Sequence, residues 1–259
     1  MAKQPLLGSH QRSWIWGRNL VAETLRAGRW TPYELRLADD ADENLRSLAD
    51  SRGVRIHDER LSRLTQLCGA ADHQGVLAKM PPFPYASSTD LLNRLRTTQP
   101  PISPSPASPD PLFVITDHVQ DAFNFGAIVR SAECFGVAGV LIPKARQVGV
   151  TSQVARSSAG AVNHVPIAQV DDLLALADEL KRQGVRLVAA SEHAATPLHA
   201  ADLAGPLAIV IGNEGVGVSR ELLTKCDLIV AIPLAGQVGS LNAAVAAGIV
   251  IYEATRRPA

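Results

Sequence analysis

The sequence predicts an α/β protein, with a parallel sheet in its C-terminal part and a small mixed α/β domain before it. From Leu112 onward, short apolar runs alternate with helical segments, which is typical of a parallel sheet covered on both faces. Residues 12–80 show shorter strands and helices in mixed order. A proline-rich stretch separates these parts. We therefore expect domains at 1–85 and 111–259, joined by a linker at 86–110.

Composition narrows the class of protein. The chain has 259 residues, and its 25 Lys and Arg residues balance 25 Asp and Glu residues. No segment has the apolar length of a membrane span, and the N-terminus is too short and polar for a signal peptide. Cys68, Cys134 and Cys226 are widely spaced and form no CxxC pair. We expect a cytoplasmic protein without disulfides, in which nucleic-acid binding would need local basic patches.

The first domain is expected to begin with an apolar strand at 14–16, followed by a helix over 20–26. Gly28 lies just beyond that helix, where a C-cap glycine belongs. His57 and His73 lack the companion spacing of a metal site, so we expect them to be packing or surface residues. The remaining expected elements are strands at 33–38 and 54–56 and a helix at 45–51.

The linker is rich in proline. Prolines at 100, 101, 104, 106, 109 and 111 exclude helix and sheet and favour an extended polyproline II conformation. Such a segment serves as a semi-rigid spacer or as a ligand for a groove on another protein. We favour the spacer.

The second domain is expected to have six apolar strands. Its last helix, beginning at Ser240, is apolar on every side, which predicts a buried core helix with Ser240 as N-cap. Ligands of parallel sheets bind at the carboxyl ends of the strands, and the unusual polar clusters of this chain follow strands. The expected strands are 112–116, 138–142, 165–168, 185–190, 207–211 and 228–232, with helices at 125–135 and 171–183.

Three polar clusters stand out. In the first, Asn124 is expected to be a helix N-cap. Arg130 lies inside an apolar helix, where it either meets an anion or reaches the surface along its stem. The second, Gly212–Gly217, is similar to a phosphate loop but lacks the Lys-Ser/Thr pair and carries Glu214, which argues against a nucleoside triphosphate. The third contains Gly236, Ser240 and Asn242.

Nucleophilic catalysis finds no support in the pattern. His118 and Cys134 flank the first cluster, but neither has an activating partner evident in the sequence, so we expect both to be structural. Basic residues are concentrated in two groups. Either group alone could simply be a solvent-exposed charged surface, but the presence of both predicts contact with phosphate groups. The two groups are Lys3, Arg12, Arg18, Arg26 and Arg29 before residue 30, and Lys144, Arg146 and Arg156 in a stretch without acids.

The three clusters resemble the motifs of the SpoU (TrmH-type) RNA 2′-O-ribose methyltransferases of the SPOUT superfamily. The order of the motifs also fits. Residues 17–23 and 73–76 resemble the small substrate-binding domain of the ribosomal-RNA branch, and 157–166 resembles the connecting stretch of the family. The matching motifs are residues 124–130, 211–219 and 232–242.

This resemblance implies a SPOUT domain with a trefoil knot, a homodimer, and S-adenosylmethionine as cofactor, with no metal. Knots are exceptions to ordinary topology and do not follow from composition. By the same likeness, catalytic roles would belong to Asn124, Arg130, Glu214, Ser240 and Asn242; cofactor binding to Gly212, Ile232, Leu234, Gly236 and Leu241; and RNA binding to Arg18, Lys144, Arg146 and Arg156. The departures from the family pattern are Ala122, Leu234 and the pair Ala243–Ala244.

The expected reaction is transfer of a methyl group to a ribose 2′-oxygen, on a guanosine of large-subunit ribosomal RNA by likeness to that branch. We assign Arg130 to the ribose and its phosphate, because a guanidinium with a pKa above about 12 is a poor base. Transfer RNA is the alternative substrate. A non-catalytic RNA-binding protein is a second alternative, against which Arg130, Glu214 and Asn242 speak. A dinucleotide enzyme would need GxGxxG after the first strand, which is absent.

Overall fold

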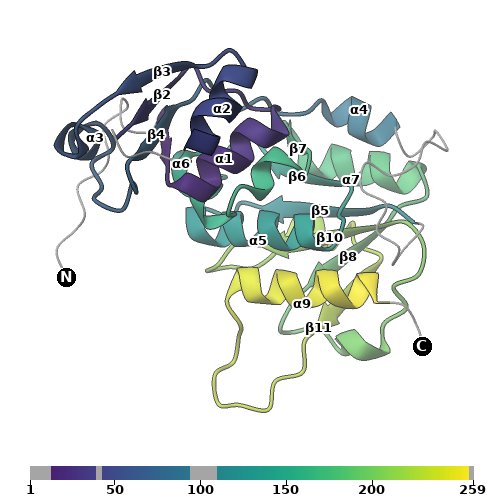
Figure 1. Cartoon of the computed structure of the whole chain (residues 1–259). Helices are drawn as coiled ribbons and strands as arrows, with labels where there is room; N and C mark the ends of the chain where they lie inside the picture. Colours follow the sequence, from purple (N-terminus) through teal and green to yellow (C-terminus); the bar gives the residue numbers. More distant parts are fainter. Residues whose placement is uncertain (1–12, 39–42, 94–109, 257–259) are drawn as a thin grey trace. The chain divides into compact units, whose positions relative to one another are not determined.

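A computed structural model describes residues 13–38, 43–93 and 110–256, which form two compact units (Figure 1). The first unit comprises the chain up to Pro84 together with Val150–His164, and the second comprises Tyr85–Gly149 and the chain from Val165. Residues 150–164 thus belong with the first unit, although they fall within 111–259 of the sequence-based division. Most of the expected proline-rich spacer, as well as Lys3 and Arg12, lies outside the described residues.

The first unit is built on a four-stranded mixed sheet in the order β1-β4-β2-β3. β4 runs antiparallel to both β1 and β2, while β2 and β3 are parallel. Gly28 ends the first helix in the left-handed conformation, as expected. The strands are β1 (Trp14–Trp16), β2 (Glu34–Leu37), β3 (Arg55–Asp58) and β4 (Val76–Lys79), and the helices are α1 (Arg18–Ala27), α2 (Glu43–Ser51), α3 (Leu61–Cys68), α6 (Ser152–Ser157) and the 3₁₀ turn Ala161–Asn163.

Side-chain contacts explain why residues 150–164 join this unit. The buried amide Nδ2 of Asn163 donates to Thr24 Oγ1 at 3.0 Å, and His164 Nε2 lies 2.7 Å from Glu23 Oε1. The guanidinium of Arg156 stacks 4.3 Å from the centre of a tryptophan ring in β1. A buried amide without a partner would be costly, so the first of these contacts ties the two segments together.

The second unit contains a seven-stranded sheet in the order β7-β6-β5-β10-β8-β11-β9. Every neighbouring pair in this sheet is parallel, which confirms the sequence expectation. The strands are β5 (Leu112–Asp117), β6 (Gly139–Pro143), β7 (Ile167–Val170), β8 (Arg186–Ala190), β9 (Thr196–Pro197), β10 (Leu207–Gly212) and β11 (Leu228–Ala231).

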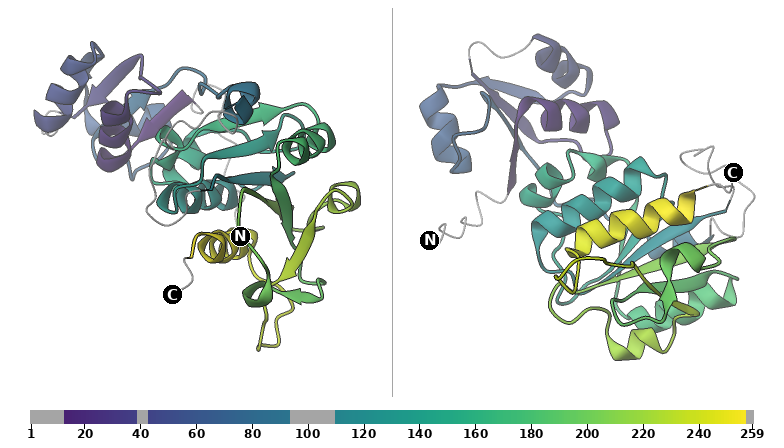
Figure 2. Two further views of the ribbon diagram at one scale, coloured as in Figure 1. Left: turned by 90° about the vertical axis from the view of Figure 1, so that its right-hand side faces the viewer. Right: turned by 90° about the horizontal axis from the view of Figure 1, so that it is seen from below.

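Helices cover both faces of this sheet (Figure 2). α5 and α9 pack against each other on one face, while α7 and α8 lie on the other. One apolar cluster joins α4, α7 and α8 to the side chains of the strands beneath them. The helices are α4 (Ser88–Asn93), α5 (Ala122–Cys134), α7 (Leu173–Arg182), α8 (Arg220–Leu223) and α9 (Ala243–Thr255), with a 3₁₀ turn at Leu198–Ala200.

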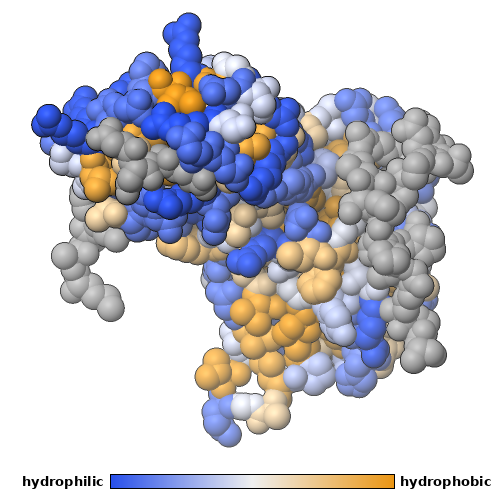
Figure 3. Space-filling view, viewed as in Figure 1, coloured by the Kyte–Doolittle hydropathy of each residue, from blue (hydrophilic) through white to orange (hydrophobic). Residues whose placement is uncertain are grey.

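The last helix differs from its expected burial. Ala247, Val250 and Ile251 of α9 are buried, but Val245 is 51% exposed and Tyr252 52% exposed. Figure 3 shows the resulting hydrophobic surface over α9. The expectation of a fully buried helix was therefore wrong for a single chain, because α9 lies outermost on its face and packs on one side only. None of the helices within the described residues is long and apolar enough to cross a membrane.

Candidate active site at the carboxyl edge of the parallel sheet

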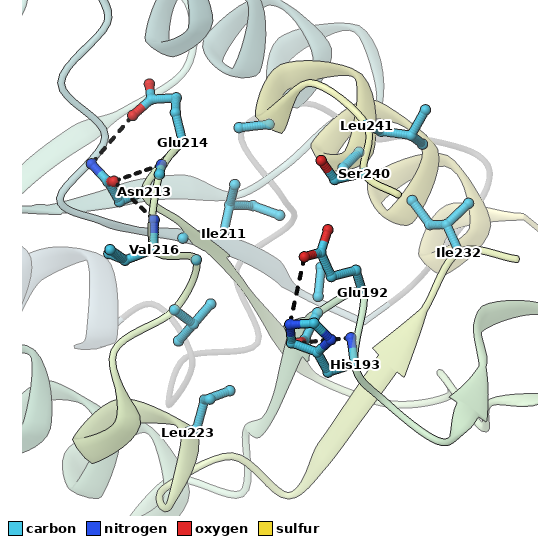
Figure 4. A pocket seen from close by; sticks show the side chains of 18 of the residues that line it. Glu192, His193, Ile211, Asn213, Glu214, Val216, Leu223, Ile232, Ser240 and Leu241 are labelled. Carbon is cyan, nitrogen blue, oxygen red and sulfur yellow. Dashed lines mark hydrogen bonds and ion pairs between the residues drawn. The ribbon is translucent and has the colours of Figure 1, made fainter. Parts of the chain in front are cut away.

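Four adjacent strands of the second unit, in the order β5-β10-β8-β11, end at one edge of the sheet. Beyond this edge the loops after β8, β10 and β11 enclose a cavity of about 510 Å³ (Figure 4). That volume is within the range of small-molecule sites. The lining is formed by residues 190–193, 211–218, Arg220, Leu223, Val230, Ile232, Leu234, Ser240, Leu241, Ala243 and Ala246.

One wall of the cavity is a tight backbone loop. A Cβ atom on Gly212 would lie 2.1 Å from the carbonyl carbon of Gly217 and from the amide nitrogen of Val218. Only glycine permits this close approach of the strand end to the returning loop. The other walls include the apolar side chains of Ile232 and Leu241. A lining that mixes apolar side chains with a few polar ones suits a small ligand with both apolar and polar parts.

The expected cofactor residues largely converge on this cavity. Gly212, Ile232, Leu234 and Leu241 line it, whereas Gly236 is not among its lining residues. Two of the expected catalytic residues, Glu214 and Ser240, line it as well. Asn124, Arg130 and Asn242 do not.

A chain of hydrogen bonds links three of the expected catalytic residues across long sequence distances. Asn242 Nδ2 donates to Asn124 Oδ1 at 2.8 Å, and Asn124 Nδ2 donates to Glu214 Oε1 at 3.1 Å. A carboxylate only accepts, so Asn124 must turn its NH₂ group toward Glu214 and its oxygen toward Asn242. The cluster therefore has one consistent amide orientation.

Helix caps differ from the sequence expectation at both motif helices. Asp121, not Asn124, is the N-cap of α5, and its carboxylate accepts from Asn124 N at 2.8 Å. Asn242, not Ser240, caps α9 and accepts from Ala244 N at 2.9 Å. The expectation failed because each helix begins at a different residue from the one assumed. The side chain of Asn124 is consequently available for the hydrogen-bond chain.

Glu214 is held as a carboxylate. Burial by itself raises the pKa of Glu214, but hydrogen bonds from Asn124 and from the backbone of Glu214, Asp121 and Gln120 outweigh it, and the net pKa lies below its ordinary value. Asn213 Nδ2 also donates to this carboxylate, at 3.3 Å. The second motif loop is thereby attached to the first.

Arg130 stands apart from this cluster. It lies six positions after Asn124 on α5, which at about 100° per residue places the two roughly 120° apart around the helix. Its side chain is exposed and, within the described residues, forms no hydrogen bond or ion pair. The guanidinium is therefore available to an anion from outside the chain.

The four expected RNA-binding residues differ in availability. Arg146 and Arg18 are exposed, although Arg18 Nε donates to Gln74 O at 3.3 Å. Lys144 Nζ forms an ion pair with Asp171 at 2.7 Å. Arg156 pairs with Asp72 in addition to its stacking contact. The sequence around Lys144 and Arg156 contains no acids, but the fold brings acids from other parts of the chain to pair with both residues.

Sequence reasoning missed two features near the site. His118 has a partner after all, because its Nδ1 lies 2.5 Å from Oδ1 of the buried Asp117, the preceding residue. The loop after β8 also contributes Ser191, Glu192 and His193 to the cavity. Their position directly after an expected strand was the signal that could have indicated them.

Comparison with known proteins decides the family. Residues 111–252 match the SpoU rRNA methylase family. The chain belongs to this family. Residues 14–86 match the substrate-binding domain of the RNA 2′-O-ribose methyltransferases. The family assignment confirms the sequence expectation of an RNA methyltransferase that uses S-adenosylmethionine.

Relatives of this SpoU-family chain are similar to it in sequence over nearly its whole length. YacO of Bacillus subtilis, named for the TrmH family of tRNA/rRNA methyltransferases, is 36% identical over 96% of this chain and 97% of its own. An uncharacterized tRNA/rRNA methyltransferase of Mycobacterium avium is 37% identical over 98% of this chain and 81% of its own.

Solved structures agree with the fold. The SpoU methyltransferase AviRb from Streptomyces viridochromogenes is 25% identical, with a TM-score of 0.76 over 95% of this chain and 89% of its own. The same enzyme has also been solved in complex with the cofactor AdoMet; that structure has a TM-score of 0.76 and 24% identity, covering 93% of this chain and 88% of its own.

Proposed function

We propose that this SpoU-family enzyme methylates the ribose 2′-oxygen of a guanosine in large-subunit ribosomal RNA. The observation that carries the proposal is the hydrogen-bonded chain Asn242–Asn124–Glu214 between three motifs, next to a cavity of cofactor size. The ribosomal substrate is favoured by the SpoU rRNA methylase match of residues 111–252, and the substrate-binding match of residues 14–86 supports an RNA substrate.

The cavity residues fit the methyl donor. Gly212, Ile232 and Leu241 would hold S-adenosylmethionine, with Leu234 at the same cavity. When bound, this cofactor supplies a methyl group already activated on a sulfonium. The protein therefore mainly aligns the ribose oxygen and keeps water away.

The polar cluster would orient the ribose. With its amide direction set by Glu214, Asn124 presents a defined edge to the substrate hydroxyl, and Asn242 reinforces it. Ser240 lies at the cavity on the same loop as Asn242. Such fixed donors and acceptors cost no reorganisation during the reaction.

Arg130 would bind the phosphate next to the target ribose. Its exposed guanidinium, which has no ion-pair partner among residues 13–38, 43–93 and 110–256, can form a bidentate contact with phosphate oxygens. A group with this high pKa holds its proton, so we assign Arg130 a positioning and charge-neutralising role.

The enzyme is proposed to act as a homodimer in the cytoplasm. Val245, Ile249 and Tyr252 leave an exposed apolar face on α9, and Phe123, near the start of the neighbouring helix α5, is exposed as well. A second copy of this face would remove these side chains from water. The trefoil knot implied by the family resemblance also stays a proposal.

The test is transfer of labelled methyl from S-adenosylmethionine to ribosomal RNA and to transfer RNA. We expect label in ribosomal RNA at a nuclease-resistant 2′-O-methyl position. Arg130→Ala should lower the rate by about 100-fold to 1000-fold, judged by the loss of other charge-stabilising donors. Arg182→Ala, which removes an exposed arginine of α7, is the matched control and should leave the rate unchanged.

Each alternative predicts a different outcome. Label only in transfer RNA would refute the ribosomal assignment and favour the other substrate in the names of the relatives. Cofactor binding by calorimetry without label in either RNA would refute both assignments of substrate. Absence of both binding and label would refute the proposed reaction and leave a non-catalytic RNA-binding protein.

A further inference from the structure

Glu192 is a carboxylate in the cavity that the motifs of the chain do not include. It lies two residues beyond the end of β8, which is flanked by β10 and β11 in the sheet. Its loop therefore opens between the two loops that carry the cofactor motifs. Figure 4 shows its carboxylate directed into the space bordered by Ile211, Ile232 and Ser240.

Glu192 differs in its hydrogen bonds from Glu214, the other acid that lines the cavity. Glu214 accepts from four donors on other residues: Asn124 and Asn213 through their side chains, and Gln120 and Asp121 through their backbone. Within the described residues, the carboxylate of Glu192 accepts no hydrogen bond and forms an ion pair only with the exposed His193, whose Nε2 lies 3.5 Å from Oε1. Glu192 thus offers at least one carboxylate oxygen to a ligand in the cavity.

The position of Glu192 favours hydroxyl groups as its ligand. Two adjacent carboxylate oxygens match the two donors of a vicinal diol, and an acid beyond a strand end holds the ribose hydroxyls of nucleotides in other parallel sheets. Asn124 follows β5, which β10 separates from β8, so the loop that carries Glu192 is not adjacent in the sheet to the segment that carries Asn124.

We propose that Glu192 binds the 2′- and 3′-hydroxyl groups of the cofactor ribose and thereby selects a ribonucleoside methyl donor. This inference rests on the proposed function, since it assumes that the cavity holds S-adenosylmethionine. It assigns a binding role and no role in proton transfer to this residue.

The test is calorimetric binding of S-adenosylhomocysteine and of its 2′,3′-dideoxy analogue. Both ligands lack the sulfonium charge, so a change in affinity cannot come from attraction between Glu192 and that charge. We expect the unmodified enzyme to prefer S-adenosylhomocysteine by about tenfold to a hundredfold, as for hydrogen bonds to a charged group.

Substitution at position 192 should remove this preference. Glu192→Ala should weaken the binding of S-adenosylhomocysteine by that factor and leave the binding of the dideoxy analogue unchanged. Glu192→Gln should keep part of the preference for S-adenosylhomocysteine. Asp202→Asn is the matched control, because Asp202 is an exposed acid of the same unit outside the cavity lining. Its variant should bind both ligands like the unmodified enzyme.

Two outcomes would overturn the inference, and a third would refute the proposed function. Equal affinity of Glu192→Ala and the unmodified enzyme for S-adenosylhomocysteine would exclude a contact. If Glu192→Ala lost the same affinity for both ligands, the carboxylate would contact a part of the ligand other than the ribose hydroxyls. Binding of a deaminated analogue would then show whether that part is the amino group. Failure of the unmodified enzyme to bind S-adenosylhomocysteine would instead refute the proposed function, so the two failures are distinguishable.

Discussion

The carboxylate of Glu214 joins the first two motifs, and replacing it by an amide should disconnect them. Its two oxygens accept from Asn124 Nδ2 at 3.1 Å, Asp121 N at 3.3 Å, Asn213 Nδ2 at 3.3 Å and Gln120 N at 3.4 Å. In Glu214→Gln one oxygen becomes an NH₂ group. Two of the four donors then face another donor.

The loss can be worked out from these contacts. The two bonds at risk are long and partly exposed, so each contributes about 0.5–1 kcal/mol, and Glu214→Gln should lower the free energy of unfolding by about 1–2 kcal/mol. Glu214→Ala loses all four and should cost about twice as much. For a chain of this size, each kcal/mol lowers the melting temperature by about 2–4 °C.

The effect on catalysis should exceed the effect on stability. Asn124 loses the acceptor that sets its amide direction, and misplacement of a substrate-orienting group costs up to about 100-fold in rate. We therefore expect kcat in Glu214→Gln to fall toward that limit at a temperature where the variant is fully folded. Urea unfolding and single-turnover methyl transfer measure the two quantities on the same preparation.

The dependence on pH follows from the lowered pKa of Glu214. Since its pKa in the folded protein lies below the ordinary value of 4.5, its stabilising contribution is fully present above 4.5 and is lost as pH falls through the folded value. The difference in unfolding free energy between the unmodified enzyme and Glu214→Gln should therefore shrink in acid. A difference independent of pH, or an unchanged rate in Glu214→Gln, would refute this account of Glu214.

Two further variants test the cavity and the apolar face. Gly212→Ala places a Cβ atom 2.1 Å from backbone atoms, so it should lower the unfolding free energy by about 1–3 kcal/mol or more and abolish S-adenosylhomocysteine binding in calorimetry. Gly239→Ala is the control, because a Cβ there meets nothing within 4 Å, and this variant should remain stable. Equal stability of the two variants would contradict the steric crowding at Gly212. Val245→Asp should convert a dimer into a monomer in sedimentation analysis without loss of folding. Leu61→Asp, at a similarly exposed apolar residue of the first unit, should stay dimeric. If Val245→Asp were still a dimer, α9 would be excluded from the interface.

The order and type of the elements in the second unit follow from the sequence alone. Apolar runs such as Leu207–Gly212, which alternate with helical segments, predict buried strands of a covered parallel sheet, and the glycines and polar residues after them mark its ligand edge. The three motifs were sufficient to indicate the family, which the comparisons confirm. These features depend on local composition and spacing.

The tertiary structure decided which side chains meet. Asn242 and Asn124 are separated by 118 positions, and Asn124 and Glu214 by 90, so no local pattern could indicate their hydrogen bonds or the caps that free Asn124. The same holds for the acids that pair with Lys144 and Arg156.

The burial of α9 was also beyond the sequence. An apolar helix indicates that its faces avoid water, but the pattern does not say whether the covering surface belongs to the same chain. In this fold α5 and β10 cover one side, and the side bearing Val245 and Tyr252 is left exposed. The sequence determined that the helix is apolar, whereas only the packing of the whole unit decided which half of it is buried, because burial depends on residues distant along the chain.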